Sequence, residues 1–511
     1  MGLIITHLKN ILPSNHQTIY NRGYKMTNYQ SQIRDVVRYI NRELIAEVPR
    51  DIYEPHTDAV DRLDDIIAGN VSPKIVPVTT TMLLLNSCLG NNTLMEGGSG
   101  TGKTKLASVV GSLLFQMPYE FLDRKRVAGT PGATVNEIYA THDLAELARG
   151  NDVAYLYLSF FAPFVLIDEL NRFSELEQNR IREGIATGVW SYAGNHAFII
   201  GNQVVVSAVN PEAYGGTFPL NENLLDNYSV VLEPAHYNPL AHAELVRKAE
   251  EKIKTQLGLL EAVDKLMVFY KTHKNEPDLI KQEIVKLQGT TLKAYQDRKI
   301  PFLANGFMAK IREEINVVPF APEANLFFYS LLGEMTHSRK FGRLRYEDTA
   351  SDDSHDAVYL STKLKEGLAG RFLKDWTEIS KALAWYFGVS QVGVDELRAA
   401  FVYTAAHRLK PETRFFQDVQ NNTRNLPVKF EVARRIAEDA WKNYSDFKGP
   451  AENENPSFNE LRKAIKLIAG QEKLDAADQS TREALRILRT ADHPLARSVL
   501  EGLAVSLLRK M

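Results

Sequence analysis

The residues whose types and spacing most clearly suit a chemical function form a glycine-rich stretch that ends in a lysine and a threonine. Gly97, Gly102, Lys103 and Thr104 have the spacing of a loop that binds the phosphates of a nucleoside triphosphate. Glycines let backbone N–H groups approach the phosphate oxygens, while the lysine neutralises charge and the hydroxyl binds Mg²⁺. We therefore expect nucleotide contacts from the whole loop: Gly97, Gly98, Ser99, Gly100, Thr101, Gly102, Lys103 and Thr104.

A pair of carboxylates follows the apolar run 164–167 and could complete the chemistry of a bound triphosphate. We expect Asp168 to hold Mg²⁺ together with Thr104, and Glu169 to polarise the water that attacks the γ-phosphate. Adjacent side chains on a strand point to opposite faces, so at a strand end the two acids can serve separate roles. The alternative is a solvated acidic pair that merely ends a strand.

A third polar residue, Asn210, follows the apolar run 203–209. Its amide can donate and accept hydrogen bonds, so it could contact both the attacking water and the γ-phosphate. Asn210 is followed by Pro211, and this dipeptide is also typical of a turn. The two interpretations are compatible, because a turn at the end of the strand leaves the amide in the same place.

The elements that position these residues alternate between strands and helices from about 71 to 238. Strands are predicted at 92–96, 164–168 and 203–209, with helical segments between them, which favours a mostly parallel sheet in an α/β fold. The helix after the glycine loop would point the positive end of its dipole at the phosphates. Beyond about 240 the pattern is helical almost throughout, so an all-helical part should follow the α/β core.

The rest of the chain divides at changes of composition. Helices are predicted at 29–47 and 57–68 after an arm at 1–25, an exposed acidic loop at 347–357, and a linker at 447–460. We expect four parts: N-terminal arm and helices at 1–70, the core at 71–238, a helical lid at 239–410 with an insertion at about 245–325, and a helical extension at 411–511.

Composition narrows the class of protein. The chain has 511 residues, 44% of them hydrophobic, and a formal net charge of −2, so no global basic surface marks a nucleic-acid binder. The single cysteine, Cys88, excludes an internal disulfide framework, fits a reducing cytoplasm, and is expected to be buried and inert. No apolar run reaches the roughly 20 residues of a membrane span. We therefore expect a cytoplasmic protein.

Taken together, these motifs resemble the AAA+ ATPases, and more narrowly the MoxR family. The matching residues are Asn171 and Arg172 after the acidic pair, Asn210 with Pro211, and Gly216, Thr217, Pro219 and Leu220. Residues 366–409 resemble the helical lid of that family, with Arg371 at the sensor-2 arginine and His407, Arg408 and Leu409 at its closing motif. The resemblance covers about 70–240 and 325–410.

The resemblance implies an AAA+ P-loop core that hydrolyses ATP with Mg²⁺ in a ring of identical subunits, expected to be a hexamer, to remodel a protein client. It also implies a von Willebrand A-type partner, which would be a separate chain because no D-x-S-x-S run occurs here. Two inserts are implied, one at about 133–163 and a hairpin at 188–203. The alternative is a nucleic-acid motor, for which a basic hairpin would be expected. The hairpin instead carries aromatic residues, which can grip a peptide or stack on bases: Trp190, Tyr192, His196 and Phe198.

The chain departs from the family at Asp226-Asn227-Tyr228, where an arginine usually reaches the neighbouring subunit's nucleotide. A neutral amide cannot supply that charge. Three explanations stay open: Arg172, Arg180 or Arg182 supplies it, hydrolysis is slow, or a partner subunit provides the arginine. We favour Arg172 as a catalytic residue, against the alternative that these arginines pair with nearby glutamates. Arg371 could act on its own nucleotide or on a neighbour's. The basic stretch 337–348 is expected to be a structural loop.

Overall fold

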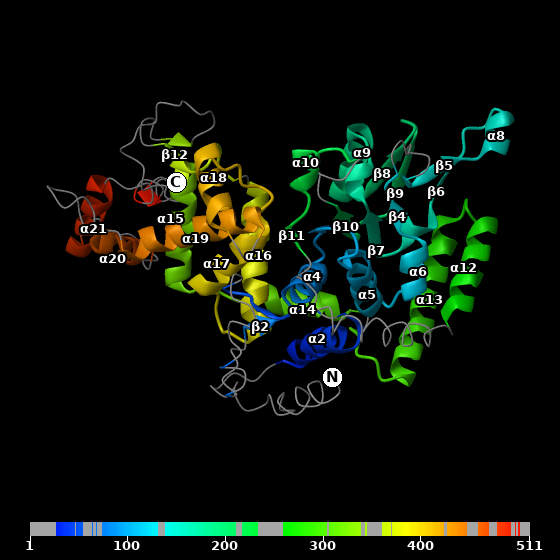
Figure 1. Cartoon of the computed structure of the whole chain (residues 1–511), viewed down its shortest axis with the longest axis horizontal. Coiled ribbons are helices and arrows are strands. Elements are labelled where there is room, and N and C mark those ends of the chain that lie inside the picture. Colours follow the sequence, from blue (N-terminus) through cyan, green and yellow to red (C-terminus); the bar gives the residue numbers. More distant parts are fainter. Residues whose placement is uncertain are drawn as a thin grey trace. The chain divides into compact units, whose positions relative to one another are not determined.

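We describe a computed structural model of the chain (Figure 1). It describes residues 27–45, 47–54, 64, 68, 74–130, 138–210, 217–233, 259–303, 306–338, 343–344, 360–368, 370–423, 427–446, 458–469, 478–491, 496 and 499–500. The chain forms two compact units. The first contains 1–317 and 382–390, and the second contains 318–381 and 391–511. We describe each unit by itself.

A five-stranded parallel sheet is the centre of the first unit (Figure 1). Its strand order is β11-β3-β10-β7-β4, and every neighbouring pair is parallel. The strands are β11 (Val230–Leu232), β3 (Thr93–Glu96), β10 (Val204–Val209), β7 (Phe164–Asp168) and β4 (Val127–Ala128). The predicted strands at 92–96, 164–168 and 203–209 are therefore confirmed. Because all strands are parallel, the glycine loop, the acidic pair and Asn210 leave the sheet at the same edge.

Two almost wholly buried helices pack beside this sheet, and apolar side chains predominate on both. Helix α4 (Val78–Leu89) precedes β3, and helix α5 (Lys103–Phe115) follows the glycine loop. A helix that is hydrophobic all round belongs in a core. Gly111 on α5 has a packing reason, since a Cβ there would lie 2.6 Å from the Phe164 ring. Cys88 on α4 is buried as predicted, and burial raises the pKa of its thiol to about 12.

Two antiparallel segments extend from this core. The predicted hairpin at 188–203 is confirmed as β8 (Val189–Tyr192) and β9 (His196–Ile199), with positive φ angles of 52° at Ala193 and 78° at Gly194. The expected insert at 133–163 contains β5 (Ala140–His142), helix α8 (Leu144–Ala148), β6 (Ala154–Leu156) and a 3₁₀ turn, η2 (Leu158–Phe161). Figure 1 shows α8 at the far end of this segment, away from the sheet. Its first residues, 133–137, lie outside the described residues.

The remaining helices of the first unit cover its periphery. The helix predicted at 29–47 is present as α2 (Asn28–Tyr39), capped by Thr27 and Gln30, followed by a π-helical turn, η1 (Ile40–Leu44). The helix predicted at 57–68 lies almost wholly outside the described residues. The other elements are β1 (Arg50–Asp51), β2 (Ile75–Val76), α6 (Tyr119–Arg124), η3 (Leu170–Arg172), α9 (Glu175–Thr187), α10 (Glu222–Leu225), α12 (Leu260–Thr272), α13 (Pro277–Asp297) and α14 (Phe307–Asn316).

The second unit is helical, as expected for the part after the core. Its elements are α15 (Pro322–Thr336), β12 (His337–Ser338), β13 (Arg343–Leu344), η6 (Leu360–Thr362), α16 (Gly370–Phe387, whose last residues belong to the first unit), α17 (Val394–Ala405), α18 (Thr413–Asn422), α19 (Val428–Asp446), α20 (Phe458–Ala469) and α21 (Gln479–Thr490). Trp376 stacks on Phe328 and Phe372 at its centre. The acidic loop predicted at 347–357, and most of the linker and of the basic stretch, lie outside the described residues.

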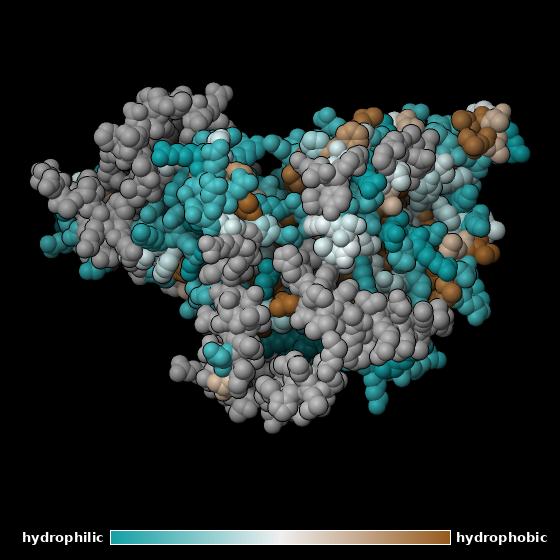
Figure 2. Space-filling model, in the orientation of Figure 1, coloured by the Kyte–Doolittle hydropathy of each residue, from teal (hydrophilic) through white to brown (hydrophobic). Residues whose placement is uncertain are grey.

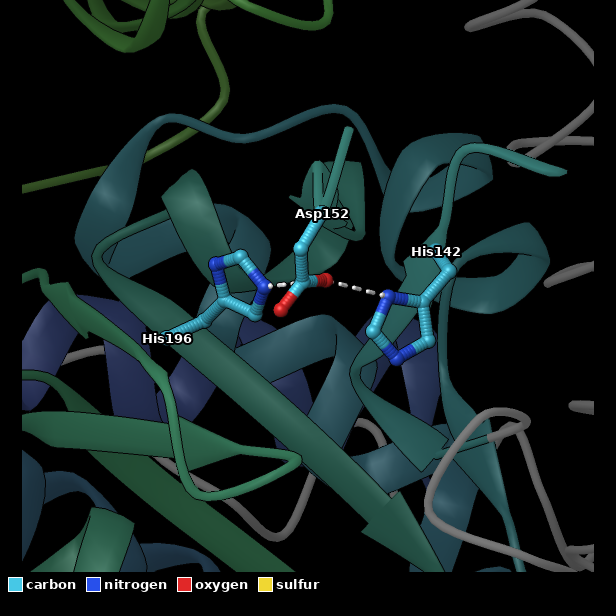
Figure 3. A group of neighbouring side chains, drawn as sticks. All are labelled: His142, Asp152 and His196. Carbon is cyan, nitrogen blue, oxygen red and sulfur yellow. Dashed lines mark hydrogen bonds and ion pairs between the residues drawn. The ribbon is translucent and has the colours of Figure 1, made fainter. Parts of the chain in front are cut away.

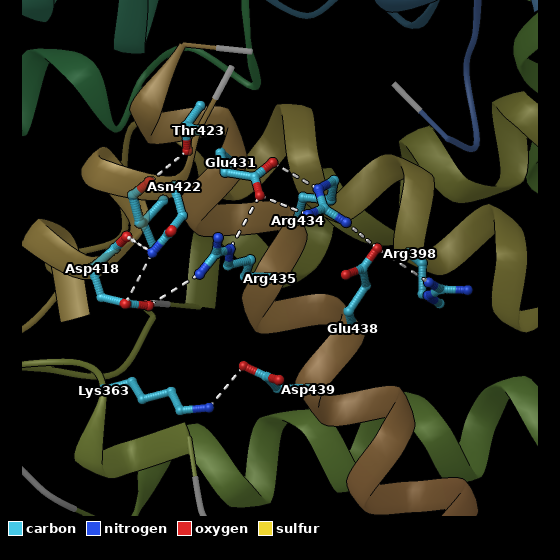
Figure 4. Close-up of polar contacts among 11 residues, drawn as sticks. Lys363, Arg398, Asp418, Asn422, Thr423, Glu431, Arg434, Arg435, Glu438 and Asp439 are labelled. Carbon is cyan, nitrogen blue, oxygen red and sulfur yellow. Dashed lines mark hydrogen bonds and ion pairs between the residues drawn. The ribbon is translucent and has the colours of Figure 1, made fainter. Parts of the chain in front are cut away.

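Charged side chains of the second unit form ion pairs within α19 and between different helical segments. Glu431 on α19 pairs with both Arg434 and Arg435, and Arg435 reaches Asp418 on α18 at 3.1 Å (Figure 4). Arg408 and Asp375 form a buried pair at 2.7 Å, with exposed side-chain fractions of 6% and 4%. A buried pair of this kind is costly to break from one side, because the remaining charge is left without a partner.

Candidate nucleotide-binding and hydrolysis site

The glycine loop runs from the end of β3 to the start of α5 and is held against the neighbouring strand. The Gly97 N–H donates to the carbonyl oxygen of Val209 at 3.3 Å. Gly100 and Gly102 have φ angles of 78° and 77°, a region that favours glycine. No heavy atom lies within 4 Å of the Cβ position at Gly100, and Ser99 beside it is exposed. The loop thus has the open backbone that close approach by phosphate requires.

Lys103, the first residue of α5, turns its side chain back over the loop. Its Nζ donates to the carbonyl oxygens of Gly97 at 2.7 Å and Gly98 at 2.8 Å, and to Asn210 Oδ1 at 3.1 Å. The residue is 6% exposed. Burial lowers the pKa of the ammonium group from its ordinary value, and the charges of Asp168 and Glu169 oppose that shift. An anion in the loop would favour the charged form in the same way.

The two residues predicted to hold a metal ion lie side by side. The Thr104 hydroxyl donates to Asp168 Oδ2 at 3.1 Å, so the start of α5 contacts the end of β7. The other carboxylate oxygen, Oδ1, accepts from the Glu169 N–H at 3.1 Å. Arg126, directly before β4, places its Nε 3.7 Å from Asp168 Oδ2.

Glu169 presents its two carboxylate oxygens to two different partners. Oε1 accepts from Asn210 Nδ2 at 3.2 Å, and Oε2 lies 3.1 Å from Arg172 Nε. The backbone of Glu169 is left-handed, with φ 53° and ψ 43°. Such a conformation is uncommon for a residue other than glycine and is typical of functional sites. Gly129 permits it, because a Cβ at that position would lie 2.2 Å from the Glu169 carbonyl oxygen.

Asn210 links the two halves of the site. Its side-chain oxygen accepts from Lys103 and its side-chain nitrogen donates to Glu169. The backbone carbonyl of Asn210 accepts from Asn171 Nδ2 at 2.8 Å, and Asn171 is 2% exposed. Strand β10 lies between β3 and β7 in the sheet, which is why its last side chain reaches both the glycine loop and the acidic pair.

The predicted arginines have different positions. Arg172 pairs with Glu169 of its own chain, rather than with the glutamates on α9. Arg371 is exposed at the start of α16 in the second unit, so its sensor role stays a prediction. Asn227, at the position of the missing arginine, donates from Nδ2 to the Asn223 carbonyl at 2.7 Å. The next residue, Tyr228, is buried and donates to Ser207 Oγ at 2.7 Å.

Sequence reasoning missed Arg126 and Gly129. Both flank β4, which has only two residues, and a strand that short carries no periodic pattern. The one signal in the sequence is the glycine that follows the apolar pair of β4. In the structure the Gly129 N–H donates to the Asp168 carbonyl at 2.8 Å, next to the pairing of β4 with β7.

The fold and this site together define the class of the chain: an α/β core with a five-stranded parallel sheet and a glycine-rich loop of the phosphate-binding type, followed by a helical part. No family model matches the sequence, and no curated protein matches it. Among solved structures, a candidate ATPase from Cytophaga hutchinsonii is similar at 14% identity and a TM-score of 0.46, covering 81% of this chain and 94% of that one. A full-length MCM homologue from Methanopyrus kandleri is similar at 12% identity and a TM-score of 0.32, covering 63% of this chain and 52% of that one. At these values the similarities carry no argument about activity.

Proposed function

We propose that this chain is an ATP hydrolase and that the network from the glycine loop to Glu169 is its active site. The observation that carries this proposal is the bridging amide of Asn210, which contacts both the phosphate-loop lysine and the candidate base. A structural turn alone would not require an amide in contact with two oppositely charged side chains. The arrangement is the one that in-line attack on a terminal phosphate needs.

The donor groups fit Mg²⁺ and a triphosphate. Thr104 and Asp168 offer a hydroxyl and a carboxylate oxygen 3.1 Å apart, and hard oxygen donors are those that Mg²⁺ prefers. Lys103 adds a positive charge beside the open glycine backbone. When bound, Mg²⁺ would neutralise charge on the phosphate oxygens. Thr104 and Asp168 are the residues that would hold it, and Arg126 Nε lies 3.7 Å from the same Asp168 oxygen that accepts from Thr104.

The protein groups then divide the remaining work. Glu169 would accept a proton from the attacking water, and Asn210 would orient that water, because its amide nitrogen already contacts Glu169 Oε1. Arg172 contacts the second oxygen of Glu169, so it would fix the direction of the carboxylate. The sensor-2 role of Arg371, on its own nucleotide or on a neighbour's, is part of this proposal.

We further infer that the chain works in a ring of identical subunits, as a MoxR-type remodeller of a protein client, with a von Willebrand A-type protein as a candidate partner. Support comes from apolar side chains on the insert, whereas Trp190 and Tyr192 of the β8–β9 hairpin are buried and offer no contact surface. Leu144 and Leu147 on α8 have 76% and 45% of their surface exposed, and Figure 2 shows hydrophobic colouring at α8. Exposed apolar side chains favour contact with protein over contact with nucleic acid. None of the described helices is long and apolar enough to cross a membrane.

The experiment that tests the client is an affinity capture with Glu169→Gln protein held in the ATP-bound state. We expect a protein to be recovered with ATP and lost in Lys103→Ala, which should not bind the nucleotide. Recovery of DNA or RNA that dissociates with increasing salt would instead favour the nucleic-acid motor.

A further inference from the structure

The two segments that extend from the core pack on each other through an aromatic cluster. Trp190 of the β8–β9 hairpin lies 5.3 Å from Tyr139 and 4.6 Å from Phe160, measured between ring centroids. All three residues are no more than 1% exposed. The Tyr139 hydroxyl donates to the carbonyl of Ser191, so a hydrogen bond joins the segments at the same place. The two segments therefore form one body in this structure.

Beyond this cluster, three side chains of metal-ligating type converge from three separate places in the sequence (Figure 3). His142 ends β5, Asp152 lies in the loop before β6, and His196 begins β9. Figure 3 shows the carboxylate of Asp152 between the two imidazole rings. Oδ1 of Asp152 is 2.9 Å from His196 Nε2 and 3.2 Å from His142 Nδ1. The three ligand atoms all lie within 4.8 Å of one another.

The chemistry and spacing of this cluster suit a divalent transition metal ion. Two imidazole nitrogens and a carboxylate oxygen are a common ligand set for zinc, with a fourth position left for water. Bonds of 2.0–2.1 Å in a tetrahedron separate ligand atoms by about 3.3 Å, which is close to the two separations to Asp152. Only a small movement of the histidines toward each other would close the site.

The surroundings of the cluster favour a ligand over a simple hydrogen-bonded bridge. His142 Nδ1 is buried, and among the residues that the structure describes it makes no hydrogen bond. Asn195 Nδ2 lies 3.4 Å from the second oxygen of Asp152 and orients the carboxylate, as outer groups do around metal ligands. Asp152 has 42% of its side chain exposed, which gives an ion a path from solvent.

We propose that His142, Asp152 and His196 bind one Zn²⁺-class ion that cross-links the β5–β6 segment to the β8–β9 hairpin. The site is separate from the nucleotide site in its ligands, because none of the three residues belongs to the network around Lys103. A bound ion would cross-link the two segments at this point, so that a movement of the hairpin would displace the other segment as well.

The test is metal binding by the full-length chain, without nucleotide. The protein is stripped with a chelator, dialysed against Zn²⁺ and analysed for bound metal, and Co²⁺ is used in parallel because its visible absorption reports imidazole ligation and geometry. We expect one ion per chain and a four-coordinate Co²⁺ spectrum. His142→Ala and His196→Ala should each weaken metal binding at least tenfold. Loss of an outer-sphere partner alone costs roughly 10–100-fold in metal affinity, and loss of a direct ligand should cost at least as much.

Two further variants keep the test decisive. Asp152→Asn has nearly the same shape as the parent residue, so it removes the charged ligand even if a histidine variant does not fold. His273→Ala is the matched control, since His273 stacks on Phe269 and is not one of the three residues of the cluster, so its loss should leave binding unchanged. Absence of bound metal in the parent protein would overturn the proposal. Binding that survives in His196→Ala and Asp152→Asn, but is lost in Asp168→Asn, would also overturn it by assigning the ion to the nucleotide site.

Discussion

Asn210 donates from its Nδ2 to Glu169 Oε1 at 3.2 Å while its Oδ1 accepts from Lys103 Nζ at 3.1 Å. One amide thus joins the cation beside the glycine loop to the carboxylate at the end of β7. The contact sets which way the amide points, because only its nitrogen can donate to Glu169 and only its oxygen can accept from Lys103. A change of charge at the loop would therefore alter the hydrogen bond between Asn210 and the candidate base.

Arg172 supplies the first prediction, because its 3.1 Å ion pair with Glu169 lies within one chain. We expect Arg172→Ala to lower ATP turnover at least about tenfold, since the carboxylate loses the cation that orients it. If Arg172 acts on its own site, mixing Arg172→Ala chains with Glu169→Gln chains should recover no activity, as measured by phosphate release.

Arg180→Ala is the matched control for loss of an arginine nearby. Recovered turnover in the mixture would show that Arg172 reaches a neighbouring subunit's nucleotide, as the sequence-based hypothesis has it. If Arg172 supplies this charge, Asn227→Arg should not increase the rate of ATP hydrolysis. A faster Asn227→Arg enzyme would instead indicate that the missing arginine limits hydrolysis.

Gly129 supplies the second prediction, which concerns the backbone under Glu169. A Cβ at Gly129 would lie 2.2 Å from the Glu169 carbonyl oxygen, so Gly129→Ala must displace the acidic pair or the edge strand. We expect a loss of about 1–3 kcal/mol in the free energy of unfolding, together with reduced turnover. Urea unfolding and phosphate release measure the two effects.

The control for this change is Gly289→Ala on α13, where nothing lies within 4 Å of the added Cβ. There alanine should stabilise the helix by up to about 1 kcal/mol. If Gly129→Ala were as stable as the parent protein, β4 would be able to shift and accommodate the added methyl group without cost, contrary to the close contact with Glu169.

Glu334 supplies the third prediction, a dependence of stability on pH in the second unit. It is 1% exposed, and burial raises the pKa of its carboxyl to about 8 although Asn443 donates to Oε2 at 2.8 Å. The folded form therefore holds a proton that the unfolded chain releases near its ordinary pKa of about 4.3. The stability from this group is present below that value and is lost as pH rises toward 8.

Urea unfolding at pH 5, 6.5 and 8 measures this dependence. We expect Glu334→Gln to flatten the decline, because the amide cannot ionise. Glu366→Gln is the control, since Glu366 is exposed beside Lys410 and its loss should leave the slope intact. An unchanged decline in Glu334→Gln would assign it to another group.

The core of the fold and the residues of the candidate nucleotide site could be predicted from the sequence because their signals are local. An apolar strand that ends in a polar residue defines both the element and the edge at which that residue emerges, as for Asp168 and Asn210. The spacing of Gly97, Gly102 and Lys103 likewise needs no tertiary information.

The contacts that the sequence could not give depend on register and on packing between distant segments. Arg126 reaches Asp168 only because β4 pairs with β7, and no periodicity marks a strand of two residues. His196 was interpreted as part of an aromatic hairpin. Its position beside His142 and Asp152 follows from the contact between two segments, which neither segment encodes alone. The left-handed backbone of Glu169 depends in the same way on the absent side chain of Gly129.

ATP binding and ATP turnover, measured on the same preparation of Glu169→Gln protein, test whether Glu169 is the base. We expect affinity for Mg²⁺-ATP to be retained within a few-fold, while turnover falls at least about 100-fold because the water loses its base. Glu175→Gln, an exposed glutamate at the start of α9, should keep both, and Lys103→Ala should lose both. Full turnover by Glu169→Gln would contradict the assignment of this site, whatever the chain is found to bind.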